Sequence, residues 1–167
     1  MKHNPILVLL WLAASSSAFA YDTQINFSGS FINSTCKING GAIPASMTVT
    51  LGRAEARKFG AAGDTQMNKD FTISLSDCTA ATTTVKWDNM VNVDASTGAL
   101  KNTVSGGSNI QIRVLNGTAP VNMASDSGRS FTGTSAQLVY TAQYYAKTVP
   151  VTPGQVSTFG TITLSYN

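Results

Sequence analysis

The chain has 167 residues, and its 11 Lys and Arg against 8 Asp and Glu give a formal net charge of +3. Only 11% of the residues are charged, against roughly 25% in an ordinary soluble domain, and no basic run marks a nucleic-acid-binding surface. The only histidine, His3, lies in a segment that we expect to be removed. The mature chain then lacks the imidazole of a Ser-His-Asp or Cys-His mechanism and of a typical zinc site. We therefore expect no enzyme, no metal site and no cofactor.

Residues 1–20 have the composition of a secretory signal peptide. A positively charged start, an apolar run over 6–14 and the small residues Ala18 and Ala20 are typical of such a leader. A membrane anchor is the alternative, but a membrane span needs about 20 apolar residues and this run is much shorter. We expect cleavage after Ala20 and export of the remaining chain.

Stretches of alternating apolar and polar residues, separated by turn residues, recur after the leader and predict strands. In chain order they are 25–33, 47–51, 71–75, 82–87, 110–114, 138–146 and 156–166. Only 54–58 resembles a helical turn, and Gly60 and Gly63 end it. Short strands with frequent turns predict a single antiparallel β-sandwich domain.

The two cysteines, Cys36 and Cys78, allow one intramolecular pairing. Export to an oxidising compartment favours a disulfide between them, which closes a long loop and contributes about 3–5 kcal/mol in the chain-entropy model. Two buried free thiols are the alternative. A metal site is less favoured, because two sulfur ligands without histidine fill only half of a zinc coordination sphere.

The remaining polar and aromatic residues give no convergent site. No spacing pairs the scattered carboxylates for glycoside hydrolysis, and we expect them to be solvated loop residues. Four aromatic residues could form either a surface on which a sugar ring stacks or a part of the hydrophobic core, and core packing is the favoured interpretation. The carboxylates are Asp64, Asp70, Asp77, Asp88, Asp94 and Asp126, and the aromatic residues are Trp87, Tyr140, Tyr144 and Tyr145.

Several features together resemble the pilin subunits of the chaperone–usher pathway, as in type 1 and P pili. Segment 25–36 resembles the family's first strand, which ends in the first cysteine, and Asp77-Cys78 resembles the second cysteine site. Tyr140-Thr-Ala-Gln-Tyr144 is similar to an aromatic-x-Ala-Arg-Tyr strand of the family, with Gln143 where arginine is common. Gly154, the fourteenth residue counted back from the end, and the penultimate Tyr166 match its C-terminal signature.

The resemblance implies an immunoglobulin-like β-sandwich that lacks its final strand and is completed by a donated one. A periplasmic chaperone lends a strand first, and at an outer-membrane usher the N-terminal extension of a neighbouring pilin subunit replaces it. Here the extension is 21–31 and the pilin domain is 32–167. Every second residue of the extension has its side chain on the same face of an extended chain. The alternative is that this segment is the domain's own first strand. The residues on that face are Thr23, Ile25, Phe27, Gly29 and Phe31.

The resemblance also assigns roles to the C-terminus. The last strand is expected to run along the chaperone, whose basic residues anchor the carboxylate of Asn167. The implied contact residues are Gly154, Ile162, Leu164, Tyr166 and Asn167.

The implied function is that of a structural subunit of a pilus, or fimbrium. It is exported through the periplasm to the bacterial surface and contributes to cell adhesion, meeting host glycans only indirectly through the pilus. The alternative is a carbohydrate-binding adhesin module at the pilus tip.

Overall fold

The computed structural model describes residues 36–43 and 45–167. The expected signal peptide, the expected donor segment 21–31 and the predicted strand 25–33 lie outside the described residues. Within the described ranges, no helix is long and apolar enough to cross a membrane.

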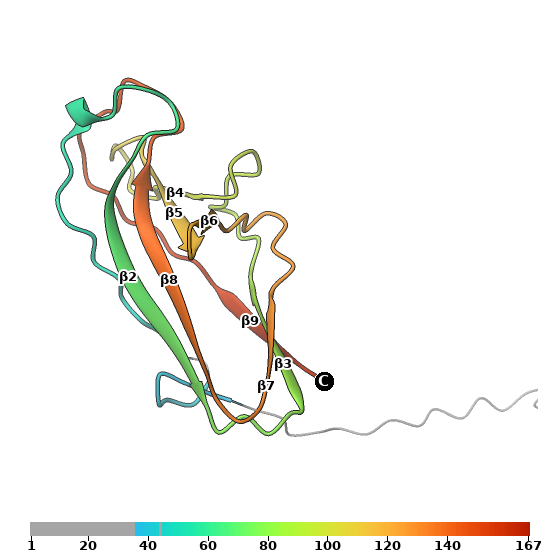
Figure 1. The fold of residues 1–167 in the computed structure, drawn as a ribbon. Helices are drawn as coiled ribbons and strands as arrows, with labels where there is room; N and C mark the ends of the chain where they lie inside the picture. The colour runs from blue at the N-terminus through green and yellow to red at the C-terminus, as the bar shows by residue number, and fades with distance from the viewer. Residues whose placement is uncertain (1–35, 44) are drawn as a thin grey trace, which may run out of the picture. The chain divides into compact units, whose positions relative to one another are not determined.

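Two antiparallel sheets form the domain and lie in separate layers (Figure 1). The larger sheet has the order β1-β2-β8-β5-β4, with β6 paired to β5, and the smaller has the order β7-β3-β9. The strands are β1 (Lys37–Ile38), β2 (Thr65–Ser76), β3 (Thr82–Trp87), β4 (Leu100–Lys101), β5 (Gln111–Asn116), β6 (Ala119–Pro120), β7 (Arg129–Thr132), β8 (Ala136–Tyr145) and β9 (Ile162–Tyr166), and one 3₁₀ turn, η1, covers Ala56–Lys58. The predicted all-β, immunoglobulin-like sandwich is confirmed, as is the helical turn.

The alternation seen in the sequence divides each long strand into an inner and an outer face. On β8, Leu138 and Tyr140 are buried, whereas Val139 between them is 52% exposed. Trp87 of β3 packs edge-on against Tyr140, with ring centroids 5.4 Å apart, and against Phe71 at 6.4 Å. Trp87 and Tyr140 therefore belong to the core between the sheets, as core packing predicts.

The predicted disulfide is present and joins Cys36 to Cys78. Cys36 immediately precedes β1 and Cys78 follows β2, two strands that pair with each other. Both cysteines are buried. The bond therefore ties the beginning of the described chain to the end of the longest strand.

Two predicted strands differ in the structure. Segment 47–51 forms no ladder with any described strand, and of 156–166 only Ile162–Tyr166 is a strand. A ladder needs a neighbouring strand as well as an alternating sequence, and the described chain supplies no such neighbour to 47–51 or 156–161. Both segments instead line the groove described below.

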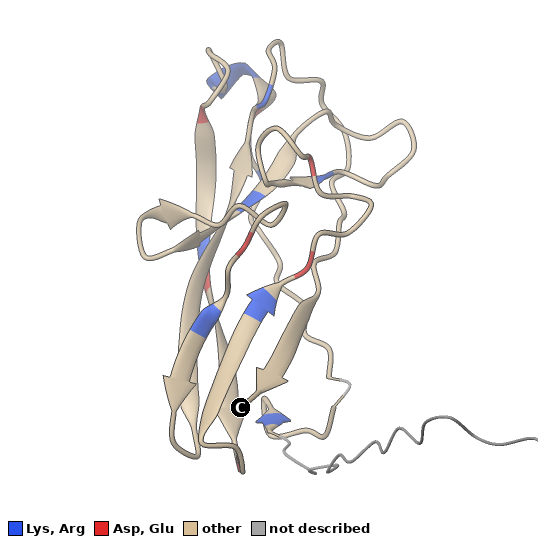
Figure 2. Cartoon of the chain, turned by 90° about the vertical axis from the view of Figure 1, so that its right-hand side faces the viewer, with Lys and Arg blue, Asp and Glu red and all other residues tan. Residues whose placement is uncertain are grey.

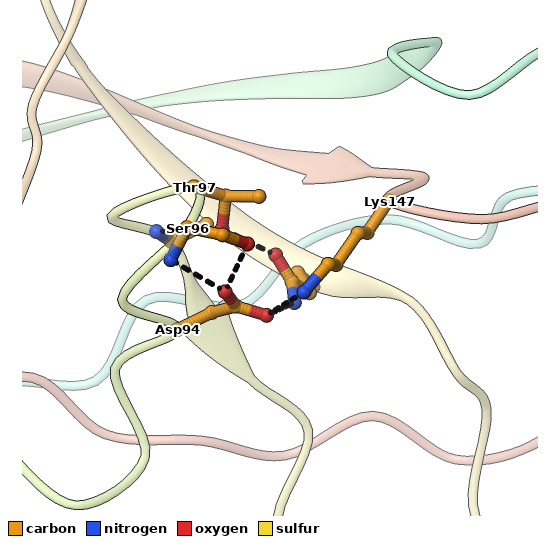
Figure 3. Close-up of polar contacts among 6 residues, drawn as sticks. Asp94, Ser96, Thr97 and Lys147 are labelled. Carbon is orange, nitrogen blue, oxygen red and sulfur yellow. Dashed lines mark hydrogen bonds and ion pairs between the residues drawn. The ribbon is translucent and has the colours of Figure 1, made fainter.

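Asp94 also departs from the prediction, which placed it among the solvated loop residues. It is only 9% exposed, and it accepts a hydrogen bond from Lys147 Nζ at 2.7 Å (Figure 3). Its other partners are the main-chain N–H and hydroxyl of Ser96 and the side-chain amide of Gln111. The cluster joins the loop after β3 to β5 and to the end of β8, contacts that sequence spacing does not reveal.

Candidate functional site

An apolar groove of about 1080 Å³ opens beside β9. Segment 45–51 and segment 156–164 with Tyr166 line it, together with Ile38, Asn39 and Ile43 and with core side chains of the sandwich. These core residues are Phe71, Ile73, Trp87, Leu100, Ile112, Val114, Ala142 and Tyr144. The inner wall of the groove is therefore the hydrophobic core of the sandwich.

The β9 strand has one paired edge and one open edge. It pairs with β3 from Thr83↔Tyr166 to Trp87↔Ile162, and no other described strand pairs with it. Thr82 and Asn167 exchange both main-chain hydrogen bonds. Because main-chain groups alternate in direction along an antiparallel pair, those of Ile162, Leu164 and Tyr166 face the open edge. Such an edge is a template for an added strand.

The side chains of β9 follow the same alternation. Ile162, Leu164 and Tyr166 are half-buried and pack against the core, whereas Thr163 and Ser165 are exposed. The Tyr166 hydroxyl accepts a hydrogen bond from the Cys36 N–H at 3.2 Å. The apolar residues expected from the family signature therefore lie together on the groove side of the last strand.

Gly154 lies before β9, where the chain passes close to the loop after β4. A Cβ atom at this position would lie 2.6 Å from the Ser108 nitrogen and 2.9 Å from the Gly107 carbonyl carbon. Gly154 lines a second cavity of about 460 Å³, which shares Leu51, Tyr144 and Val156 with the groove. The glycine of the C-terminal signature thus permits a close approach of two main-chain segments at one end of the site.

The groove suits an apolar, uncharged occupant. None of the described residues lining it is Lys, Arg, His, Asp or Glu, and burial raises the pKa of the Tyr144 phenol, which keeps it neutral. Elsewhere, Lys, Arg, Asp and Glu are dispersed over several elements (Figure 2). The described residues include no group of three or more His, Cys, Asp or Glu able to hold a metal. The available interactions are apolar burial and main-chain hydrogen bonding along β9.

Comparison with known proteins agrees with this geometry. The family described as Fimbrial protein matches residues 25–167. This chain belongs to the fimbrial protein family. The F17 fimbrial protein of Escherichia coli is 32% identical over 96% of both chains. The fimbrial subunit type 1 of Salmonella typhimurium is 31% identical, with 85% of this chain and 81% of the relative covered.

Solved structures support the same fold for this fimbrial protein. The P pilus rod subunit PapA superposes with a TM-score of 0.59 at 21% identity, covering 79% of this chain and 99% of that chain. As a member of the fimbrial protein family, the protein is a structural subunit of a pilus, exported through the periplasm to the cell surface, and other pilin subunits are its partners. The five residues that the sequence predicts to form the donor strand, Thr23, Ile25, Phe27, Gly29 and Phe31, lie outside the described residues, so their role as donors stays a prediction.

Proposed function

We propose that this subunit polymerises by donor-strand exchange, with the groove beside β9 as the acceptor and residues 21–31 as the donor. The observation that carries the proposal is the open edge of β9 beside an uncharged groove. Large apolar side chains along the groove are solvent-exposed, including Met47 at 44% and Phe159 at 51%. A strand added at the open edge of β9 would cover the groove and extend the smaller sheet.

The sequence of the donor segment suits this groove. Ile25, Phe27 and Phe31 recur at even spacing, so in an extended chain they project from one face. Gly29 lies between Phe27 and Phe31 on the same face and suits a point where the donor backbone approaches the groove closely. An uncharged groove lining binds apolar side chains such as these more favourably than it would bind a charged ligand or a carbohydrate.

A periplasmic chaperone and an outer-membrane usher are the further partners in this proposal. An exposed apolar edge aggregates readily, so the subunit needs a temporary strand between export and assembly. In this role the chaperone covers Ile162, Leu164 and Tyr166, and its basic residues bind the carboxylate of Asn167. Gly154 shapes the adjoining end of the site.

Assembly of this kind is head to tail and does not close on itself, so it produces a filament rather than a ring. In this proposal the subunit contributes to adhesion as a part of the assembled pilus. Neither a catalytic step nor a cofactor is involved. The adhesin alternative has less support, since Trp87 and Tyr140, two of the candidate sugar-stacking residues, are buried in the core.

The proposal is tested by grafting a second copy of residues 21–31, behind a flexible linker, after Asn167. If the graft fills the groove, burial of three large apolar side chains raises the free energy of unfolding by at least about 5 kcal/mol. Thermal unfolding of the mature chain with and without the graft measures this effect.

A second grafted chain with Asp in place of the Phe27 copy is the matched control. It should unfold near the temperature of the ungrafted chain, because a carboxylate is costly to bury in an apolar groove. Equal midpoints for the original graft and the ungrafted chain would show that the sandwich needs no donated strand.

A further inference from the structure

The segment 150–161, here called the strap, connects β8 to β9 and lines the groove from Val156 onward. No described strand pairs with the strap. Three asparagines from the chain between β3 and β5 bind it instead. They are Asn92, Asn102 and Asn109.

Asn102 binds the middle of the strap on both of its amide atoms. Its Nδ2 donates to the Gln155 carbonyl at 2.8 Å, and its Oδ1 accepts from the Ser157 N–H at 2.9 Å. Thr103 N–H donates to the Ser157 carbonyl at 2.9 Å, and Ser108 N–H donates to the Gln155 carbonyl at 3.1 Å. A side-chain amide carries the same donor and acceptor groups as a peptide bond, so Asn102 takes the place of part of a neighbouring strand.

Asn92 and Asn109 bind the strap on either side of Asn102. Asn92, which is 4% exposed, donates from Nδ2 to the Phe159 carbonyl at 2.7 Å and to the Thr158 hydroxyl at 2.9 Å. Asn109 accepts from the Thr152 N–H at 2.9 Å and donates to the Pro150 carbonyl at 3.1 Å. The strap is therefore fixed along its length before any strand is donated.

From Gln155 onward, the hydrogen bonds of the strap continue the alternation of β9, whereas at the beginning of the strap the even-numbered Pro150 and Thr152 bind Asn109. Odd-numbered residues direct main-chain groups toward the domain: Gln155, Ser157 and Phe159 toward the asparagine-bearing chain, and Thr161 toward the Asp88 N–H. In β9, odd-numbered residues likewise face β3. In an extended chain, the main-chain groups of 156, 158 and 160 then face the same side as those of 162, 164 and 166.

We infer that Asn92, Asn102 and Asn109 are positioning residues that preform the first half of the acceptor edge. A donated strand then pairs along 156–166, and not only along the five residues of β9. The inference rests on the proposed function, since it concerns the binding of a donated strand to the same groove. Because hydrogen bonds already hold the strap in place, less conformational entropy is lost on binding.

The test uses the full mature chain and, as probe, a synthetic peptide with the sequence of residues 21–31. Amide hydrogen exchange is measured residue by residue with and without the peptide. In the unaltered chain, the peptide should slow exchange at Thr158 and Gly160 as well as at Leu164 and Tyr166.

Asn102→Ala should abolish the protection at Thr158 and Gly160 and leave that at Leu164 and Tyr166. Loss of about two hydrogen bonds along the edge should speed peptide dissociation about tenfold. Asn116→Ala is the matched control. Its side chain accepts one hydrogen bond, from Arg129, away from the groove, and both readouts should equal those of the unaltered chain.

Asn109→Ala keeps the test decisive if Asn102→Ala fails to fold. Asn109 is exposed and contacts only the beginning of the strap, and its replacement should weaken protection at Thr158 and leave that at Leu164 and Tyr166 unchanged. Unchanged protection in the folded asparagine variants would overturn their positioning role.

The outcomes separate this inference from the proposed function. Protection confined to 162–166 in the unaltered chain would overturn the inference and leave donor-strand binding standing. No protection at any of these amides would count against the donor-strand proposal itself.

Discussion

The Asp94 carboxylate accepts four hydrogen bonds, from two groups of Ser96, from Gln111 and from Lys147 (Figure 3). The hydrogen bond from the Lys147 ammonium has the largest effect on the pKa of Asp94 and lowers it well below its usual value. The hydrogen bonds from Ser96 and Gln111 lower this pKa further, whereas burial acts in the opposite direction. The ionised form is thereby favoured in the folded chain. Its stabilising effect is therefore complete above the pKa of the unfolded chain, about 3.9, and is lost as the pH falls further.

Replacement of Asp94 by Asn should cost about 1–3 kcal/mol at neutral pH, because Lys147 loses its carboxylate partner. The unaltered chain should lose stability more steeply than Asp94→Asn between about pH 4 and pH 2, so that the two converge in acid. Urea unfolding at pH 7 and at successive lower pH values measures both effects. Asp70→Asn, which alters one exposed contact with Thr141, is the control, and parallel pH profiles for Asp94→Asn and the unaltered chain would contradict the assignment.

Gly154 is a second residue whose size affects how two segments pack together. Any side chain at this position would collide with the main chain of Gly107 and Ser108. Gly154→Ala should lower the free energy of unfolding by about 1–3 kcal/mol through overpacking and should displace the beginning of the strap. Chemical unfolding measures the loss. Gly60→Ala is the control, since its nearest neighbour would be 3.9 Å away. Equal stability of the two variants would show that the strap moves aside freely.

At the scale of secondary-structure elements, β9 and the strap show why an alternating sequence does not by itself define a strand. Segment 156–166 was predicted as one strand, yet regular alternation of apolar and polar residues covers only its second half, and only 162–166 has a paired neighbour. In the preceding residues, asparagine side chains and loop main chain replace that neighbour. The alternation therefore correctly indicated which side chains face inward, whereas ladder formation depended on what lies alongside.

The Tyr166 ring and hydroxyl have separable roles in the last strand. Tyr166→Ala removes the ring from the groove and should lower the amount of subunit that co-purifies with the periplasmic chaperone. Tyr166→Phe keeps the ring and loses only the hydrogen bond from Cys36, which should reduce stability by about 1 kcal/mol and leave capture intact. Periplasmic yield and chaperone co-purification measure both, and full capture of Tyr166→Ala would exclude a contribution of the ring.

At the scale of the whole molecule, the proposed assembly places donor and acceptor in different parts of one chain, and such an arrangement allows open-ended assembly. A chain without residues 21–31 retains the groove and lacks the donor. It should accept one strand, donate none and therefore end a filament. Added in increasing proportion to the unaltered subunit, it should shorten filaments progressively, as measured by electron microscopy. Unchanged filament length would mean that the donor lies elsewhere.

The sequence alone determined the all-β class, the pairing of Cys36 with Cys78 and the inward-facing residues of β8 and β9. These properties depend on composition, on the presence of only two cysteines and on the two-residue period of an extended chain. The groove, the Asp94 cluster and the asparagine contacts with the strap were decided by the tertiary structure. Each joins residues distant in sequence, such as Asp94 with Lys147 and Asn102 with Ser157, and a local pattern carries no information about which distant segments pack together.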